Sequence, residues 1–176
     1  MVYNATNEAT RFRHGSIKMR IEIATSKDLP AILSVVNSAF VVETFIEGTR
    51  TDATQLGALM QKGEFLLVRE GETVVASIYT ELRGNRGYFG MLAVDPSQQG
   101  LGLGRTMVAA AEEKFRASGC RYVDISVLSP RLELFPFYRK LGYTETGNSK
   151  DYPSPDKLKP GVVCKEIWMS KQLVSD

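Results

Sequence analysis

The chain has 176 residues, of which 43% are hydrophobic and 24% are charged, a size and composition typical of one globular domain and not of a disordered or fibrous protein. Its formal net charge of +2 at pH 7 gives no indication of nucleic-acid binding, and we expect no nucleic-acid partner. No apolar run approaches the roughly 20 residues that cross a bilayer, so we expect a soluble, cytoplasmic protein without a membrane partner.

The beginning of the chain differs in pattern from the rest. Residues 1–18 carry polar side chains without a hydrophobic period and are predicted to form an N-terminal extension. A single domain is predicted over residues 19–176. Its first strand is indicated by Ile21 and Ile23, which alternate with polar neighbours.

Two helices are predicted next. Ser26 and Asp28 are residue types that cap helices, and they precede a run whose apolar residues fall on one helical face over residues 29–39. A second helix is predicted over residues 52–62, where Gly63 ends the apolar period.

Three consecutive strands are predicted from short apolar runs at residues 65–69, 73–82 and 86–94. The segments 70–72 and 83–85 between them each hold a glycine among polar residues, which is typical of tight hairpin turns. We therefore expect an antiparallel meander.

A glycine-rich segment after Val94 leads into a helix with a pronounced apolar face, which Gly119 ends. The strand predicted over residues 122–127 should lie parallel to the strand that ends at Val94, because a helical crossover joins the two.

The last part of the chain has weaker signals. Residues 129–135 are predicted to be irregular, and Pro136 is predicted to open a short helix over residues 137–141. Strands at residues 143–146 and 162–169 are predicted to complete the domain.

The glycine-rich segment carries Gly100, Gly102 and Gly104 directly before a helix. Without Cβ atoms on one side of the turn, main-chain N–H groups and the positive end of the helix can approach an anion closely. Each glycine costs roughly 0.5–1 kcal/mol relative to alanine, and a phosphate-bearing ligand would explain why three are present. A glycine-rich connector without a ligand is the alternative.

Two other phosphate-binding motifs fit this segment poorly. A dinucleotide-binding turn has the spacing Gly-X-Gly-X-X-Gly and opens a strand–helix–strand unit, whereas Arg105 stands at the third glycine position here and the turn follows a meander. The Walker loop is excluded because no Gly-Lys-Ser or Gly-Lys-Thr is present.

The pattern Gln99-X-X-Gly102-X-Gly104, after the apolar strand that ends at Val94, resembles motif A of the GNAT superfamily of acyl-CoA-dependent N-acetyltransferases. Downstream, Phe-Tyr-Arg-Lys-Leu-Gly-Tyr at residues 137–143 resembles motif B of the same superfamily. The resemblance implies an α/β (α+β) fold, with a mixed, mostly antiparallel sheet of six to seven strands flanked by about four helices. Its two central parallel strands would splay apart.

The resemblance also implies acetyl-CoA as co-substrate, and no metal. Pantetheine would lie in the slot between the splayed strands, paired with main-chain groups of Leu92 and Val94, and pyrophosphate would contact the amides of residues 100–105. Arg131 stands where many members have an asparagine that contacts pantetheine, and we leave it outside the binding set. The predicted cofactor-binding residues are Leu92, Ala93, Val94, Gln99, Gly100, Leu101, Gly102, Leu103, Gly104, Arg105 and Thr106.

Motif B places Tyr138 where the family has the acid that protonates the departing thiolate, and a packed aromatic is the alternative. A main-chain N–H near Leu92, freed by a bulge in the strand, is predicted to donate to the oxyanion. The amine must lose a proton, and the sequence does not choose among Glu43, Glu47, Glu81 and a chain of water molecules as the acceptor of that proton.

Other catalytic chemistries are disfavoured. The only histidine is His14, in the polar extension, so catalysis by an imidazole in the domain is not expected. Cys120 and Cys164 have no CxxC spacing and no neighbouring base, which predicts reduced structural thiols and neither a metal site nor a covalent acyl-enzyme.

The favoured function is transfer of an acetyl group to a primary amine of a small molecule or peptide, by direct attack in a ternary complex. The alternatives are a catalytically silent acyl-CoA-binding sensor or partner-binding module, and transfer of a longer acyl chain. Residues 40–52 are expected to line the acceptor side, with 150–161 as another wall. The acceptor and the oligomeric state, including a homodimer, are left open.

Overall fold

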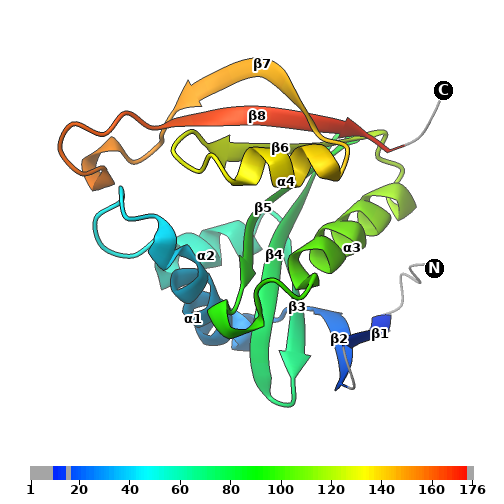
Figure 1. Ribbon diagram of the computed structural model, residues 1–176. Coiled ribbons are helices and arrows are strands. Elements are labelled where there is room, and N and C mark those ends of the chain that lie inside the picture. The colour runs from blue at the N-terminus through cyan, green and yellow to red at the C-terminus, as the bar shows by residue number, and fades with distance from the viewer. Residues whose placement is uncertain (1–9, 15–16, 174–176) are drawn as a thin grey trace.

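The computed structural model describes residues 10–14 and 17–173. One mixed sheet of eight strands has helices on both faces, which confirms the predicted fold class (Figure 1). The strands are β1 Thr10–His14, β2 Ile17–Ile23, β3 Glu64–Glu70, β4 Thr73–Arg83, β5 Arg86–Val94, β6 Tyr122–Leu128, β7 Thr144–Asp151 and β8 Lys165–Gln172. The helices are α1 Leu29–Ala39, α2 Ala53–Met60, α3 Leu103–Ala117 and α4 Leu134–Lys140, with short 3-10 turns η1 Ser26–Asp28, η2 Phe40–Val42, η3 Pro96–Gln98 and η4 Pro155–Lys157.

The sheet has the order β1-β2-β3-β4-β5-β6-β8-β7. The predicted meander of β3, β4 and β5 is antiparallel, and β6 runs parallel to β5, as the helical crossover predicted. One strand more than expected is present because β1 and the first residues of β2 lie within the segment assigned to the N-terminal extension. At least residues 10–14 of that segment are therefore paired to the sheet.

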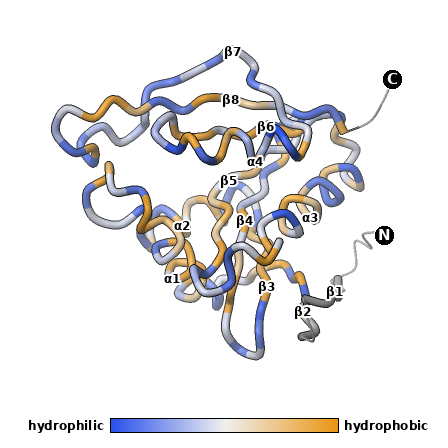
Figure 2. The backbone as a smooth tube through the Cα atoms, in the orientation of Figure 1, coloured by the Kyte–Doolittle hydropathy of each residue, from blue (hydrophilic) through white to orange (hydrophobic). Residues whose placement is uncertain are grey.

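Two hydrophobic cores lie on opposite faces of this sheet. α1 and α2 cover one face, where Ile32, Val36 and Leu56 are fully buried. α3 and α4 cover the other, where Met107 and Phe115 are fully buried. In Figure 2 hydrophobic residues follow the strands and helix faces that meet in these cores, whereas the outer strand β7 is hydrophilic.

The two parallel strands diverge after a short contact. Residues Arg86–Tyr88 of β5 pair with Tyr122–Asp124 of β6, and beyond them β5 continues to Val94 and β6 to Leu128 with no further pairing between the two. The contact is fastened by Arg86, whose Nε and Nη2 donate to the Asp124 carboxylate at 2.5 and 2.6 Å. The predicted splay is thus present and begins after the third residue pair.

Gly87 lets helix α3 approach this short contact. A Cβ atom built on Gly87 would stand 2.4 Å from the Cγ of Phe115, whose ring packs directly on the strand backbone. Only a residue without a side chain fits there, and the contact sets how closely α3 approaches β5.

Replacing Gly87 with alanine is expected to lower the free energy of unfolding by about 1–3 kcal/mol, because an overpacked core must shift. Gly57→Ala is the matched control, since a Cβ on that helical glycine would meet its nearest atom at 3.9 Å. The control should raise stability by about 1 kcal/mol. Urea unfolding of the two variants measures both effects, and equal stabilities would contradict the tight packing at Gly87.

A buried polar network joins α3 to the end of α4. The Tyr143 hydroxyl donates to Glu112 at 2.9 Å, and the Lys171 ammonium donates to the same carboxylate at 2.8 and 2.9 Å. The Tyr143 ring in turn packs edge-on against Tyr138, with ring centroids 6.0 Å apart. The network therefore fixes the helix that carries Tyr138.

The last elements differ from the sequence prediction in their limits. α4 begins at Leu134, because Pro136 stands in its first turn, where a missing N–H leaves no helical hydrogen bond unmade. β7 extends to Asp151 although all eight of its residues are exposed, so no apolar alternation indicated it. β8 begins at Lys165, and Val163, which was predicted to be in this strand, is 78% exposed in the preceding loop.

Candidate active site

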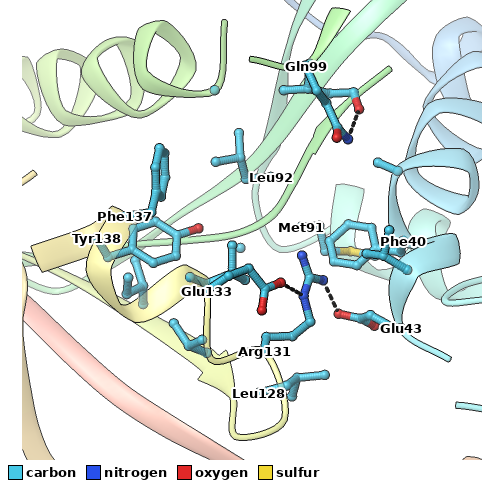
Figure 3. Close-up of a pocket in the computed structure, with 18 of the residues that line it drawn as sticks. Phe40, Glu43, Met91, Leu92, Gln99, Leu128, Arg131, Glu133, Phe137 and Tyr138 are labelled. Atoms are coloured by element: carbon cyan, nitrogen blue, oxygen red, sulfur yellow. Dashed lines mark hydrogen bonds and ion pairs between the residues drawn. The ribbon is translucent and has the colours of Figure 1, made fainter. Parts of the chain in front are cut away.

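A cavity of about 680 Å³ occupies the space where β5 and β6 diverge. Its walls come from η2, β5, the start of α3, β6 and α4. We call the part lined by Gln99, Gly100, Gly102 and Gly104 the glycine end, and the part lined by Glu43, Arg50, Arg131 and Glu133 the charged end. In Figure 3 Gln99 lies on the opposite side of the cavity from Arg131 and Glu43.

The glycine end includes the N-terminus of α3, where the first main-chain N–H groups have no partner within the helix. Gly100 and Gly102 have φ angles of +77° and +87°, which side chains rarely tolerate. The first helical hydrogen bond of α3 runs from Thr106 N–H to the Gly102 carbonyl, and Gly102 supplies no side-chain cap. The first amides of α3 therefore have no partner within the helix, and the helix dipole adds positive potential at the same place.

Arg105 adds to this potential. It lines the cavity in the first turn of α3, which carries no acidic residue. A cation at a helix N-terminus opposes the helix dipole, so its position is favourable once an anion lies between the two. The glycine end thus has the features of an anion site.

Gly104 leaves room in the slot. A Cβ atom on this helical glycine would stand 3.8 to 3.9 Å from the side chains of Val94, Leu92 and Phe137, all of which line the cavity. Neither backbone strain nor a clash within the protein demands glycine here. The missing Cβ therefore serves to keep the slot open, and the residues fit a thin, phosphate-bearing ligand.

Most of the predicted binding residues meet at this cavity, but three do not line it. The Ala93 side chain is buried on the opposite face of the sheet, Leu101 is 57% exposed to solvent, and the Thr106 hydroxyl donates to the Gly102 carbonyl at 3.2 Å. The residues that line it are Leu92, Val94, Gln99, Gly100, Gly102, Leu103, Gly104, Arg105 and Tyr138.

A bulge occurs in β5 where the sequence predicted one. The pairing with β4 passes from Ser77 opposite Ala93 to Tyr79 opposite Gly90, so β5 holds one extra residue. Met91 takes up this residue with a φ angle of +49°, an uncommon conformation for a side chain that is not glycine. Main-chain groups at Met91 and Leu92 thereby leave the regular ladder beside the cavity.

The Val94 main chain, which was predicted to pair with pantetheine, already has a hydrogen-bond partner in the protein. Gln99 Nε2 donates to the Val94 carbonyl at 3.0 Å, so one lone pair of this oxygen is in use (Figure 3). A carbonyl can accept a second hydrogen bond.

Tyr138 lies between the two ends of the cavity. Its side chain is largely buried against Phe89 and Tyr143, and in Figure 3 its hydroxyl points into the open space. Burial raises the pKa of this hydroxyl above its usual value, so the group keeps its proton at any physiological pH. The position suits a proton donor.

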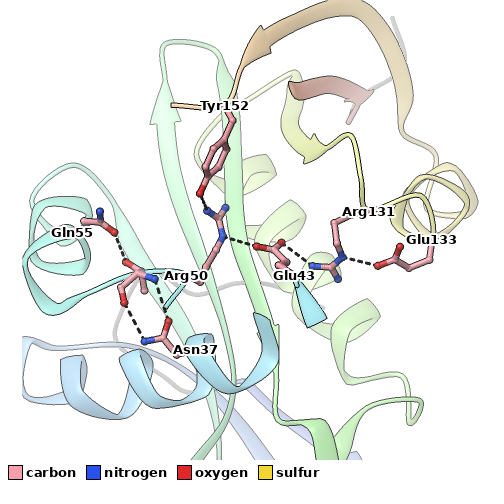
Figure 4. Close-up of polar contacts among 8 residues, drawn as sticks. Asn37, Glu43, Arg50, Gln55, Arg131, Glu133 and Tyr152 are labelled. Carbon is pink, nitrogen blue, oxygen red and sulfur yellow. Dashed lines mark hydrogen bonds and ion pairs between the residues drawn. The ribbon is translucent and has the colours of Figure 1, made fainter. Parts of the chain in front are cut away.

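The charged end is a chain of ion pairs (Figure 4). Arg131 Nη1 donates to Glu43 Oε1 at 2.9 Å and Arg131 Nε donates to Glu133 Oε1 at 2.6 Å. Arg50 Nε lies 3.3 Å from Glu43 Oε2, and Arg50 Nη1 donates to the Tyr152 hydroxyl at 3.1 Å. Burial raises the pKa of Glu43, and the guanidinium groups of Arg50 and Arg131 oppose that rise.

Of the three carboxylates considered as bases, Glu43 lines the cavity. Glu81 is held away from it by the Arg83 guanidinium at 2.9 and 3.0 Å, and these hydrogen bonds lower the pKa of Glu81. Glu47 is exposed, and its main-chain N–H donates to the Lys157 carbonyl.

Several lining residues were not singled out from the sequence. Phe40 and Arg50 lie in the segment expected on the acceptor side, whereas Met91 and Glu133 carried no recognised signal of their own. Phe137 is the first residue of the motif B stretch and was assigned to core packing, but it lines the cavity. The segment 150–161 supports this wall from behind, since Tyr152 contacts Arg50 and Leu158 forms a β-bridge with Ile46.

The two cysteines are buried and free, and burial raises the pKa of both Cys120 and Cys164. Neither lines the cavity. A buried thiol that holds its proton is a poor nucleophile, which disfavours a covalent intermediate at either residue.

Within residues 10–14 and 17–173, none of the helices is both long and apolar enough to cross a membrane. In the same residues no group of histidine, cysteine, aspartate and glutamate side chains is placed to hold a metal ion.

Comparison with known proteins places these features in one family. Solved structures with the same fold include the ribosomal-protein-S18-alanine N-acetyltransferase of Escherichia coli, with a TM-score of 0.71 and 17% identity over 90% of this chain and 96% of that chain. The structure of yncA from Salmonella typhimurium, solved with its cofactor acetyl-CoA, has a TM-score of 0.69 and 21% identity over 90% of this chain and 95% of that chain.

A third structure, smu.2055 from Streptococcus mutans, has a TM-score of 0.72 and 20% identity over 88% of this chain and 99% of that chain. No curated protein matched the sequence significantly. Residues 30–143 match the Acetyltransferase (GNAT) family, and this match spans more than half of the chain. The protein belongs to the GNAT acetyltransferase family.

Proposed function

We propose that the protein transfers an acetyl group from acetyl-CoA to a primary amine by direct attack in a ternary complex. One observation carries this proposal: the glycine end, the bulge at Met91 and the Tyr138 hydroxyl border one continuous cavity. A ligand that reaches from the anion site past the bulge brings its far end to Tyr138. When bound, acetyl-CoA supplies the thioester from which the acetyl group is transferred.

Each group then has a distinct role. The N-terminal amides of α3 bind the pyrophosphate, and each charge-assisted hydrogen bond contributes roughly 1.5–3 kcal/mol. The freed main-chain N–H at Leu92 donates to the carbonyl oxygen on which negative charge develops. Tyr138 donates its proton to the leaving sulfur, and the dry surroundings favour this transfer because they penalise a free thiolate.

Glu43 is the base in this proposal. The amine must arrive uncharged, and for an ordinary alkylamine removal of its proton at pH 7 costs about 4.6 kcal/mol. Glu43 lines the cavity, its raised pKa brings it closer to that of the amine, and Oε2 accepts no hydrogen bond from the described residues.

The test is release of free thiol from acetyl-CoA in the presence of amines, combined with calorimetric titration of acetyl-CoA. Amine-dependent thiol release supports the enzyme. Binding without turnover on any amine would favour the silent sensor, and a preference for longer acyl-CoA thioesters would favour the longer-chain alternative.

Replacing Gly104 with alanine is expected to separate binding from stability. The variant should be at least as stable as the parent, because alanine is the better helix former by about 1 kcal/mol. Its affinity for CoA should fall by about 5- to 100-fold, since the new methyl group fills the slot. Calorimetric titration and a melting curve of the same sample measure both, and unchanged affinity would show that no ligand uses this space.

A further inference from the structure

The charged end holds two arginines around one buried carboxylate. The Glu43 side chain is only 3% exposed, whereas the Glu133 side chain is 63% exposed and largely screened by water. The guanidinium carbons of Arg50 and Arg131 lie 5.4 and 5.9 Å from the centre of the same Phe40 ring, so the two cations converge on one place. The buried part of the cluster therefore has an excess of one positive charge.

Both arginines retain hydrogen-bonding capacity. Arg131 uses Nε and Nη1 for its carboxylate partners, and Arg50 uses Nη1 for Tyr152. Within the part of the chain that the structure describes, Nη2 of each arginine donates no hydrogen bond, and both residues line the cavity. In Figure 3 the Arg131 guanidinium extends from between Glu133 and Glu43 toward Met91, at the bulge.

The cluster is held in place before any ligand arrives. Asn37 on α1 exchanges two hydrogen bonds of 3.1 Å with the main chain of Thr51, which fixes the residue after Arg50 (Figure 4). Ile46, in the same segment, packs in a small core with Leu128 and Tyr152. A rigid pair of guanidinium groups loses little entropy when it binds a planar anion.

We propose that the acceptor is a small amino acid, whose carboxylate is bound by Arg131 with Arg50 while its amine faces Glu43. This inference rests on the proposed function and names the substrate class of the same site. The unused Nη2 of each arginine can donate a charge-assisted hydrogen bond to an oxygen of that carboxylate. Glu43 Oε2, which accepts no hydrogen bond among the described residues, is the group left for an ammonium.

Neither the cofactor nor a second buried carboxylate balances the excess charge of the buried part of the cluster. The pyrophosphate of CoA is assigned to the glycine end, on the far side of the cavity (Figure 3). Glu166, a half-buried carboxylate near Arg50, does not line the cavity and forms no ion pair with either arginine in the described part of the chain. Apart from the exposed Glu133, the charged end thus has only Glu43 as a carboxylate for its two guanidinium groups.

The experiment compares matched acceptors: glycine, alanine, leucine, glutamate, β-alanine and γ-aminobutyrate, each against its own amide. Values of kcat/KM are corrected for the fraction of free amine at the assay pH, because an amide lowers the pKa of the neighbouring amine. We expect at least one acid to exceed its amide by tenfold or more. Equal use of all pairs, or preference for the amides, would overturn the proposal.

Variants then test the residues. Arg131→Gln should reduce the ratio of acid to amide at least tenfold, Arg131→Lys should restore part of it, and Arg139→Gln should leave it unchanged. Arg139 is an exposed arginine that pairs with Glu145 outside the cavity. Both members of a ratio are measured on the same sample, so a smaller fraction of folded protein does not change the ratio. Arg50→Gln provides a second test if Arg131→Gln does not fold. An unchanged ratio in both would remove the arginines from acceptor recognition.

A binding measurement separates this inference from the proposed function. The N-acetylated acids and their N-acetylated amides are titrated calorimetrically into the protein saturated with CoA. Tighter binding of the acids, lost in Arg131→Gln, supports the carboxylate site even if no amine is turned over, in which case only the proposed function fails. Turnover of peptides or polyamines together with equal binding of acids and amides would leave the proposed function intact and reject the inference.

Discussion

Replacement of Gly102 by aspartate is expected to abolish detectable binding of acetyl-CoA. The residue precedes α3 at the glycine end, where a Cβ atom would have nothing within 4 Å and where the first amides have no partner within the helix. A carboxylate there would occupy the anion site, repel the pyrophosphate and bond to the same N–H groups. Loss of two such hydrogen bonds alone corresponds to a loss of more than about 100-fold in affinity.

The strain of the substitution needs its own control. Gly102 has a φ angle of +87°, so any side chain costs about 1–2 kcal/mol of stability, although aspartate before a helix recovers part of this by capping it. Gly161→Asp carries the same strain, with a φ angle of +81°, in a loop away from the cavity. Calorimetric titration should find normal affinity in the control. Normal affinity in Gly102→Asp as well would refute the phosphate assignment.

Tyr138→Phe is expected to lower kcat by about 100-fold or more and to leave acetyl-CoA affinity nearly unchanged. The hydroxyl is the only part removed, and general acid catalysis typically contributes factors of about 10²–10⁴. Tyr122→Phe is a suitable control, because this tyrosine lies under the Arg86 guanidinium, outside the cavity. Steady-state kinetics and a binding titration distinguish the two effects. A parallel loss of affinity and turnover would reassign Tyr138 to packing.

The direction of the Tyr138 pKa shift adds a pH dependence to this prediction. A proton donor acts below its pKa, and burial raises the pKa of this hydroxyl above the usual value near 10. The wild-type kcat should therefore show no decline from loss of this proton up to about pH 10. Glu43 acts above its pKa, so kcat/KM should rise with pH through the acidic range.

The parts of the fold that the sequence predicted were those with local signals. The meander, the helices and the parallel placement of β6 follow from apolar periodicity, from short turns, and from the handedness of a helical crossover. A strand was predicted at residues 143–146, but the extension of β7 to Asp151 was missed because its exposed residues carry no apolar period. This part of β7 is identified by its pairing with β8. β1 was missed because the sequence of residues 10–14 has no hydrophobic period, and its pairing with β2 identifies it as a strand.

The candidate site likewise has one part that the sequence predicted, the glycine end, and one that it did not, the charged end. The glycine end lies within one continuous segment, so its residues could be proposed together from the glycine spacing and the resemblance to motif A. The charged end joins positions separated by 88 residues between Glu43 and Arg131 and by 102 between Arg50 and Tyr152. Taken singly in the sequence, the glutamate and the two arginines are ordinary surface charges and the tyrosine is an ordinary aromatic residue. Only the folded chain brings them together.

The short seam between β5 and β6 has a mechanical consequence. Three residue pairs connect the half of the sheet formed by β1 to β5 with the half formed by β6 to β8. A slender molecule seated in the gap bridges the halves along the length that the chain itself leaves unjoined. The more tightly such a molecule binds, the more it should raise the temperature at which the protein unfolds, because both effects come from the same contact.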